Sequence, residues 1–466
     1  MYYWVFISKN MLIKGSKRLV LSVCSLLGLV IIVLQFYNEN WIASVGLWTK
    51  TAFSADSKGQ RVKPSQGLIS TGNPGDSYGA SEKDIVKTHR EVYSVSTTNK
   101  EYFPIVFGQQ EALNPNIIPH PTLNDTWIIV AQKQKGSVEN SVWAAELVCN
   151  AVFKDDTLAC VNPPEILPIA ATEGDKCVGD LDYFAFNIGP HDARVFYGPS
   201  TPYAIYGSNS MITCFGQWIQ DFRMLMDWGY ESFNKQEFRR PTELHRPLPY
   251  RPVEKNWFLF WDKYNKVYAH YDIAPNRVFA KLEFDGSVGP DLAPFAASSD
   301  SKCMEKYLPP IAPQLESIHQ ATNSLSITLC ERSDPLCEPN DNNTFILTVF
   351  QHKSFYSFHS VYEPYIMLFQ QTTPFQIHAM STKPIWIHGR GEAKIPDGLS
   401  KEYVRNWNQT EMFYVVSLSW KMHDQKYHGY VDDVMFIAFG IEDERAAGID
   451  VVAGDLLVDL GLCQNS

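Results

Sequence analysis

The chain has 466 residues, a formal net charge of -11, 20% charged residues and 45% hydrophobic residues. This composition is typical of a folded globular protein, and the acidity argues against nucleic acid or an anionic membrane surface as a partner. Aromatic residues make up 13% of the chain, which favours β-structure. Their ring faces could also stack on sugars, although core packing explains the larger share of them.

The N-terminal residues have the pattern of a membrane anchor. Residues 1–18 include Lys9, Lys14, Lys17 and Arg18, and residues 19–36 form an apolar run without charge. A run of about 18 residues is long enough to cross a bilayer, and the basic flank predicts that the N-terminus stays in the cytosol. We expect a cytosolic tail over 1–18 and a transmembrane signal anchor over 19–36. A cleaved signal peptide is the alternative.

A polar segment separates this anchor from the folded part. Residues 37–100 are interrupted by Gly, Ser and Pro and lack a sustained helical or strand period, so we expect a disordered stem. Residues 101–466 then form a lumenal globular domain. This layout is common among Golgi glycan-processing enzymes, and it also occurs in receptors and adhesion proteins.

The cysteines and glycosylation sequons agree with a secretory compartment. Cys149 and Cys160, and likewise Cys330 and Cys337, are close enough in sequence to close local hairpins. An even set in a lumenal domain predicts disulfides, while a zinc site is the weaker alternative because no Cys-x-x-Cys pair occurs. The other cysteines, for which three pairings remain open, are Cys177, Cys214, Cys303 and Cys463. Sequons for N-glycosylation occur at Asn124, Asn342 and Asn408.

From residue 101 onward the sequence is a series of short predicted strands, rich in Val, Ile, Tyr, Phe and Trp and bounded by turn residues. Helical periodicity is limited to residues 217–226 and 454–462. The predicted strands cover residues 126–134, 141–149, 193–198, 202–209, 256–262, 266–273, 277–284, 325–330, 344–352, 365–371, 375–381, 413–420 and 434–441.

The predicted strands are grouped. Several stretches share a polar start, a strand, a turn and a second strand that ends in polar residues, at an irregular spacing of about 50–80 residues. This pattern favours an all-β fold, a five-bladed β-propeller, with a pair of two-sheet sandwiches as the alternative. In a propeller the starts of the blades converge on the axis, so polar residues at these positions would share one central pocket.

The stretch "GPHDARVFYGPSTPYAIYGS", residues 189–208, contains the most suggestive of these starts. It resembles the Glu-Asp-Pro-Arg motif of fungal β-mannosyltransferases and of the five-bladed β-mannoside phosphorylases and hydrolases. Residues 254–286 are similar to the Glu-Lys-Asn-Trp blade of the fungal enzymes, and residues 374–392 are similar to a late blade of the phosphorylases. The resemblance covers most of residues 102–459 in outline, and these three stretches in detail.

Asp192 and Arg194 are the residues of the motif that carry over. The resemblance implies sugar transfer in a central pocket, with Asp192 as the catalytic carboxylate that handles a proton or orients a hydroxyl. Arg194 would hold this carboxylate or meet a phosphate. The residues alone also allow a plain ion pair at a strand start. His191 and Ala193 stand where the family has Glu and Pro, so His191 either supplies a group that titrates near neutral pH or is a solvated turn residue.

Other polar strand ends supply further candidates for substrate binding. Asn256 opens its blade, and Trp257 offers a stacking face or packs in the core. His270 and Tyr271 end the next strand, where they would reach the channel or the surface.

The C-terminal stretch supplies acidic candidates. Asp433 starts a predicted strand and Asp443 follows its end. They could provide the second carboxylate that a glycosidase needs, or they could cap turns in solvent. Asp180 and Asp182 have the Asp-x-Asp spacing of metal-dependent nucleotide-sugar transferases, but no βαβ pattern surrounds them, so no metal site is predicted.

The sequence thus predicts a Golgi glycosyltransferase, a single-pass type II membrane protein. It would transfer a hexose, mannose from GDP-mannose, to a glycan acceptor, without a firmly implied cofactor other than this donor. The alternatives are a β-mannoside hydrolase or phosphorylase on the same fold, and a non-catalytic propeller that binds glycan or protein.

Overall fold

The computed structural model describes residues 87–134, 144–186, 188–228, 237–312, 314–356, 359–395 and 409–463. The predicted tail, the anchor, most of the stem and the sequon at Asn408 lie outside these residues. Within them, no helix has the length and apolar character needed to span a bilayer. Residues 77–466 form one compact unit, and the description below concerns the described part of this unit.

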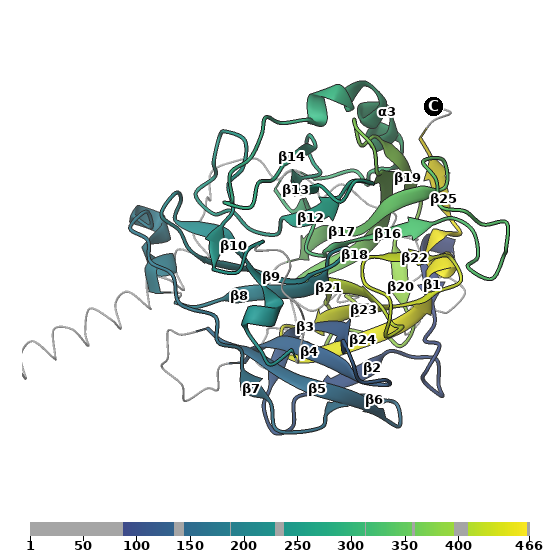
Figure 1. The fold of residues 1–466 in the computed structure, drawn as a ribbon, viewed down its shortest axis with the longest axis horizontal. Coiled ribbons are helices and arrows are strands. Elements are labelled where there is room, and N and C mark those ends of the chain that lie inside the picture. The colour runs from purple at the N-terminus through teal and green to yellow at the C-terminus, as the bar shows by residue number, and fades with distance from the viewer. Residues whose placement is uncertain are drawn as a thin grey trace, which may run out of the picture. The chain divides into compact units, whose positions relative to one another are not determined.

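The unit is mostly β-structure, and its strands fall into five antiparallel groups in chain order (Figure 1), of which the first and the last belong to one nine-stranded sheet. Group 1 comprises β3 (Ala112–Pro119), β4 (Trp127–Lys133), β5 (Glu146–Lys154) and β6 (Thr157–Cys160). Group 2 comprises β8 (His191–Tyr197), β9 (Pro202–Asn209), β10 (Phe215–Asp221) and β11 (Thr242–Glu243). Group 3 comprises β12 (Phe258–Trp261), β13 (Val267–Asp272) and β14 (Val278–Lys281).

The last two groups are completed by strands from elsewhere in the chain. Group 4 comprises β16 (Ser324–Thr328), β17 (Thr344–Tyr356), β18 (His359–Gln370) and β19 (Ile377–Ser381). Group 5 comprises β21 (Phe413–Trp420), β23 (Val434–Ile441) and β24 (Arg445–Val452). The strands β15 (Glu316–His319), β22 (His428–Tyr430) and β25 (Leu460–Leu462) pair with β17, β16 and β19, and β7 (Glu165–Ile166) pairs with β5.

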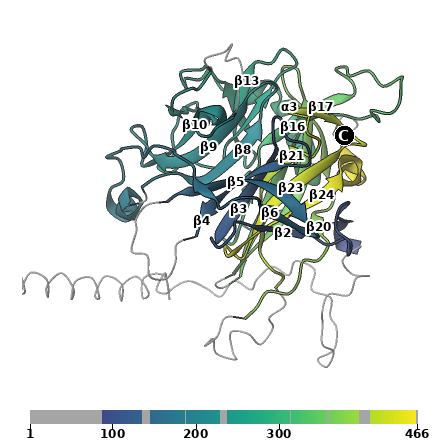
Figure 2. The ribbon, with the colours of Figure 1, turned by 60° about the horizontal axis from the view of Figure 1, so that its bottom comes forward.

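The N-terminal strand β2 (Phe103–Val106) connects the last group to the first. It pairs antiparallel with β24 and parallel with β6, so the blue strands of group 1 lie beside the yellow strands of group 5 in both views (Figure 2). Apolar clusters join group 1 to group 2, groups 2 to 5 to one another, and group 5 back to group 1. Each group therefore packs on its neighbours, and the last packs on the first.

The thirteen predicted strands each overlap an observed strand, but the predicted helices are wrong in part. Residues 217–226 belong to β10 and to the short 3-10 helix η2 (Phe222–Met224), because β10 pairs with β9 over its full length. Residues 454–462 form the end of η4 (Ala453–Leu457) and β25. The helix α3 (Ala297–Tyr307) was not predicted, because it buries only Asp300 and Cys303 and has no apolar stripe. The remaining 3-10 helices are η1 (Gly179–Phe186) and η3 (Ala293–Phe295).

The folded part begins before the predicted boundary at residue 101. The strand β1 (Arg90–Val92) pairs in parallel with β20 (Ile385–Ile387), and Val92 is buried. The Ser94 hydroxyl donates to Asp450 Oδ1 over 2.6 Å. Apart from Val92, residues 90–100 are attached to the rest of the unit mainly by such hydrogen bonds. Their sequence therefore looks polar.

Buried amide side chains hold the first strands of neighbouring groups in register. Asn116 on β3 donates to the Ala193 carbonyl (2.8 Å) and accepts from the Val195 N–H (3.0 Å). Asn323, just before β16, bonds the backbone of Leu418 on β21 in the same two-way manner, over 2.9 Å each. A side-chain amide has the donor and acceptor of a peptide group, so these residues replace a missing strand-to-strand ladder between groups.

Four disulfides connect the eight cysteines that follow residue 36. The two predicted local pairs, Cys149–Cys160 and Cys330–Cys337, are confirmed. The other pairs, Cys177–Cys214 and Cys303–Cys463, are one of the three arrangements that the sequence left open. The zinc alternative is wrong because all eight sulfur atoms are in disulfides.

Candidate functional site

A small cavity lies where the first strands of the five groups approach one another. It has about 210 Å³ of empty volume, and each group contributes to its wall at the start of its first strand. The lining residues are Asn114, Asp192, Ala193, Arg194, Asn256, Ala321, Tyr414 and Val416. The predicted site residues Asp192, Arg194 and Asn256 are thus brought together from distant parts of the sequence.

Three residues of this wall have a left-handed backbone. The φ angles are 55° at Asn114, 50° at Asp192 and 66° at Asn256. The pairing register shifts at Asn114 in β3 and at Asp192 in β8, as in β-bulges. Such a conformation costs of order 1–3 kcal/mol per non-glycine residue and clusters at functional sites, and bulges often re-aim side chains beside such sites. This convergence in one cavity marks it as the candidate site.

The environment of Asp192 is polar and ordered. Asn114 Nδ2 donates to Asp192 Oδ1 over 3.3 Å, and the Asp192 N–H donates to Gln132 Oε1 over 3.1 Å. Asn114 itself lies against Gly440 of group 5, where an added Cβ would stand 2.4 Å from Asn114 Oδ1. The carboxylate of Asp192 is therefore oriented by contacts that start in group 5 and pass through group 1.

Arg194 bonds neutral oxygens rather than the carboxylate of Asp192. Its guanidinium donates to the Ala321 carbonyl (2.9 Å) and to Gln217 Oε1 (2.8 Å). An ion pair between Asp192 and Arg194, which the sequence allowed, would need both side chains on one side of a regular strand, and the left-handed backbone at Asp192 breaks that alternation. Burial lowers the pKa of Arg194 to about 10, so the group stays cationic at neutral pH. This leaves a buried positive charge beside Asp192.

Asp443 and two tyrosines stand beside this cavity. The rings of Tyr362 and Tyr414 are 4.9 Å apart. Burial, then the charge of Asp443 and that of Asp192, raise the pKa of Tyr362 to about 12. Asp443 itself is exposed, and its carboxyl has a raised pKa because of partial desolvation and the negative charges of Asp192 and Glu442. Asp443 is thus a second carboxyl close enough to Asp192 for the two charges to interact.

Basic groups gather on the same side. Lys353 Nζ lies 5.4 Å from the centre of the Tyr362 ring, and burial together with the charge of Lys255 lowers the pKa of Lys353. Burial and the charges of Lys353 and Lys255 lower the pKa of His319 to about 4. Lys255 directly precedes Asn256 in a stretch that the sequence singled out. Nothing in the sequence marked Lys353 or His319, since they reach the site through the pairing of β15 with β17.

A buried carboxyl, Glu146, lies behind Asp192 and was also missed. Its Oε1 accepts from the Ala193 N–H over 3.3 Å, its Oε2 is buried, and the side chain has no exposed surface. Burial, with the charge of Asp192, raises the pKa of Glu146 well above its ordinary value. Glu146 lies inside the predicted strand 141–149, and its only sequence signal is an acidic residue within an apolar run.

Three predicted residues of the third group lie in the core rather than in the cavity wall. Trp257 is 1% exposed and packs edge-on against Tyr271 at 4.7 Å. The Tyr271 hydroxyl donates to the His245 carbonyl over 3.0 Å. His270 is fully buried, stacks on Phe258 and bonds Gln320 over 2.9 Å. These side chains are used in packing, so the expectation that His270 and Tyr271 reach the channel or the surface is wrong, while the core alternative for Trp257 is confirmed.

Asp433 lies at the other end of its group. It precedes β23, whose far end pairs with the start of β21 near the cavity. The carboxylate accepts from Arg332 Nε (3.0 Å) and Nη2 (2.7 Å). Along a strand of this length the separation from the cavity is about 24 Å, so Asp433 is a turn residue of the opposite face.

The remaining predicted residues lie outside the cavity wall. The ring of His191 lies edge-on to Phe215 at 5.6 Å, and its backbone pairs with Gly207. Asp180 and Asp182 lie in η1. Among the described residues, no three His, Cys, Asp or Glu side chains are grouped as metal ligands.

No family model matches the chain, and no curated protein sequence is similar to it. Several solved structures of carbohydrate-active enzymes are similar in fold. The β-1,2-mannobiose phosphorylase of Listeria innocua has a TM-score of 0.39 at 10% identity, over 78% of this chain and 96% of that one. The GDP-Man-dependent mannosyltransferase MPT-1 of Leishmania mexicana has a TM-score of 0.35 at 9% identity, over 75% and 89%. A GH62 α-L-arabinofuranosidase of Coprinopsis cinerea has a TM-score of 0.39 at 8% identity, over 76% and 97%. At these scores and identities the similarities define neither a family nor an activity for this chain.

Proposed function

We propose that this chain is a carbohydrate-active enzyme built on a five-bladed β-propeller, in which the five strand groups are the blades. The observation that carries the proposal is the convergence of five first strands on one cavity with three left-handed residues, Asn114, Asp192 and Asn256. Asp192 is the catalytic carboxylate, which orients a sugar hydroxyl or accepts its proton.

The reaction that we propose is hexosyl transfer from a nucleotide sugar to a glycan. A buried Arg194 that bonds only neutral oxygens, together with Lys255 and Lys353, supplies positive potential beside Asp192. Cationic side chains of this kind favour the diphosphate of a nucleotide sugar. GDP-mannose is proposed as the donor because of the sequence resemblance of residues 189–208 and 254–286 to β-mannosyltransferases.

A β-mannoside hydrolase or phosphorylase is the second candidate, and Asp443 is the observation that favours it. These reactions use a carboxyl that can donate a proton to the leaving group, and a raised pKa suits that role. The pKa of Asp443 is raised, and its charge interacts with that of Asp192. A phosphorylase would also use the basic groups, for inorganic phosphate.

The cavity is too small to hold a sugar ring. Its space for water-sized molecules is about 10 Å³, about enough for one water and far below the roughly 300–1,000 Å³ of small-molecule pockets. The donor and acceptor would therefore lie at the mouth of the cavity, among Asp443, Tyr362 and Lys353.

The test uses the full chain, purified in a detergent without a sugar headgroup. It is incubated with a panel of nucleotide sugars and manno-oligosaccharides, and nucleotide release is measured together with chain growth. We expect both with GDP-mannose, and we expect Asp192→Asn to reduce the rate by at least about 100-fold while leaving the melting temperature in place. If mannose is released and no nucleotide sugar is consumed, the protein is a hydrolase and not a transferase. If Asp192→Asn has an unchanged rate, Asp192 is not a catalytic residue.

We also propose a Golgi, type II location with residues 19–36 as the anchor. Four disulfides and the exposed sequons at Asn124 and Asn342 support exposure to an oxidising lumen. We expect residues 101–466 to be protected from added protease in sealed Golgi vesicles. We also expect the mass of the protein to fall after treatment with a glycosidase that removes N-linked glycans. Digestion of this segment in intact vesicles would contradict the orientation.

A further inference from the structure

Two large recesses lie on the face opposite to the catalytic cavity. The first has about 1410 Å³ of empty volume, partly open to solvent, and is lined from the β12–β13 turn, β16, β22 and the loop that follows β21. The second, of about 1740 Å³, is lined from the β3–β4 turn, the same loop and the start of β23. Tyr414 and Val416 reach the cavity, whereas Trp420 ends β21, about 20 Å further along the strand. The recesses are therefore a separate site.

Gln425 is the residue on which this inference depends. It follows β21, lines both recesses and is only 7% exposed. Its Nε2 and its Oε1 are both buried, and neither has a hydrogen-bond partner among the described residues. A buried amide that makes no hydrogen bond is costly, so two donors and one acceptor remain to be satisfied by a ligand or by water.

The charges around Gln425 are largely paired within the protein. Arg332 and Asp433 form a two-point ion pair, and Lys263 bonds Asp341 over 2.5 Å. As many Asp as Lys and Arg side chains line the first recess, and Asp outnumbers them in the second. The recesses therefore offer no excess positive charge to a phosphate. The unsatisfied amide of Gln425 is neutral, which favours a neutral ligand with both hydroxyl donors and acceptors.

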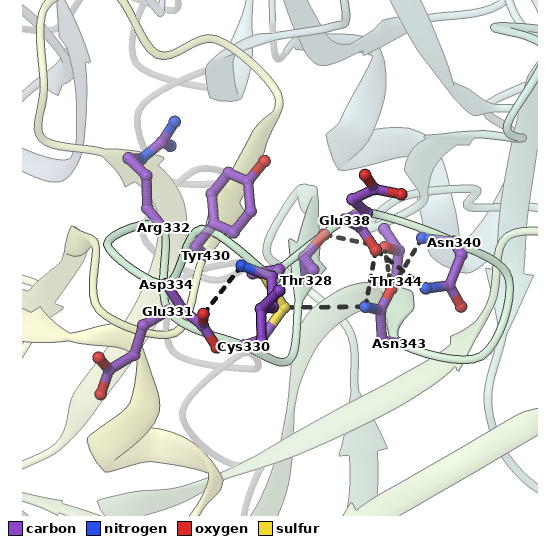
Figure 3. Close-up of a disulfide and its surroundings, with 12 residues drawn as sticks. Thr328, Cys330, Glu331, Arg332, Asp334, Glu338, Asn340, Asn343, Thr344 and Tyr430 are labelled. Atoms are coloured by element: carbon purple, nitrogen blue, oxygen red, sulfur yellow. Dashed lines mark hydrogen bonds between the residues drawn. A yellow bond between two sulfur atoms is a disulfide. The ribbon is translucent and has the colours of Figure 1, made fainter.

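Aromatic and polar side chains form a further part of the wall of the first recess. Figure 3 shows Arg332, on the loop closed by the disulfide Cys330–Cys337, beside Tyr430 of β22, and the guanidinium lies 4.3 Å from the ring centre. His428 Nε2 bonds Thr328 Oγ1 over 2.8 Å. The disulfide fixes the loop that carries Arg332, so this wall is preorganised.

Both recesses have a glycosylation sequon at or next to their rim. Asn124 lines the second recess, and Asn342 directly follows Asp341, which lines the first. Saccharide attached to either residue would be within reach of Gln425. The saccharide that binds there can thus be a free glycan or the N-linked glycan of the chain itself.

We propose that these recesses form a second saccharide-binding site, distinct from the catalytic cavity, in which the Gln425 amide bonds sugar hydroxyls. The site does not depend on the reaction proposed for Asp192. Its occupant is a neutral oligosaccharide, either free or linked to Asn124 or Asn342.

The test is calorimetric titration of the full chain with mannotetraose, cellotetraose and, as a non-saccharide probe, tetraglycine. Gln425→Leu removes both unsatisfied atoms and is expected to weaken saccharide binding by at least about tenfold, with an unchanged or higher melting temperature. Gln109→Leu, at an exposed position, is the matched control and binds as the parent does. Asp192→Asn also keeps binding, which separates this site from the catalytic one.

A second arm distinguishes the two sources of saccharide. If the chain's own glycan fills the site, the Asn124→Gln/Asn342→Gln protein binds added mannotetraose or cellotetraose and the glycosylated parent does not. If the ligand is free glycan, both proteins bind. Absence of saccharide binding by both proteins, equal binding by Gln425→Leu, or a preference for tetraglycine would overturn the proposal.

Discussion

Asn116 joins the first two strand groups and supports the backbone of Asp192, so its removal tests how the site is held. The residue is 1% exposed, and its amide bonds the Ala193 carbonyl (2.8 Å) and the Val195 N–H (3.0 Å). Asn116→Ala leaves these two buried backbone groups without that partner. Each unsatisfied group costs about 1–3 kcal/mol, so we expect a loss of about 2–6 kcal/mol in the free energy of unfolding.

This loss is large compared with a total stability of about 5–15 kcal/mol. The assay is urea unfolding of the oxidised protein, followed by tryptophan fluorescence, in which the midpoint falls while the slope is unchanged. Asn276→Ala is the control, because Asn276 is exposed and such surface changes stay within about 0.5 kcal/mol. A loss for Asn116→Ala no larger than that of the control would refute the idea that side-chain amides hold the groups together.

The remaining predictions concern a buried acid and the disulfides. Because burial raises the pKa of Glu146, the wild type loses stability relative to Glu146→Gln as pH rises above the ordinary carboxyl value of 4.5, and below that value the difference no longer changes with pH. Thermal melts from pH 4 to pH 8 measure this, and a constant difference across that range would contradict it. Loss of the disulfide Cys303–Cys463, which spans 160 residues, should cost about 5 kcal/mol, against about 2 kcal/mol for Cys330–Cys337, which spans 7. Urea unfolding of the paired Cys→Ala variants checks this, and equal losses would argue against a loop-entropy origin.

The positively charged side chains of the candidate site are relevant to whether the proposed reaction is sugar transfer or glycoside hydrolysis. Arg194 keeps its charge without a bonded carboxylate, and burial, then the charges of Lys353 and Lys255, lower the pKa of His319. Positive potential of this kind suits a diphosphate or phosphate substrate, and this is why we propose transfer as the first candidate. Asp443 remains the group that a hydrolase or phosphorylase would need.

The sequence by itself determined the strands and the local disulfides. Alternating or continuous β-branched and aromatic runs, ended by Gly, Pro, Asn or Asp, predict strands because the pattern that buries one face is local. Cys149–Cys160 and Cys330–Cys337 could be paired because each closes a short loop. Asn256 could be singled out because it opens a predicted strand, whereas Asp192 and Arg194 were singled out by the family resemblance of residues 189–208.

Only the tertiary structure decided which polar strand ends face the cavity. Asp433 and Asp443 flank the same strand, yet only Asp443 is close enough to Asp192 for their charges to interact, because the two ends of β23 lie on opposite faces. Trp257 and His270 are taken up by packing that involves several groups, which no local pattern records. Lys353, Glu146 and Gln425 acquire their meaning from burial and from neighbours far away in sequence. The energy of a buried charge or amide depends on what surrounds it in space, and that is fixed only when the five groups pack together.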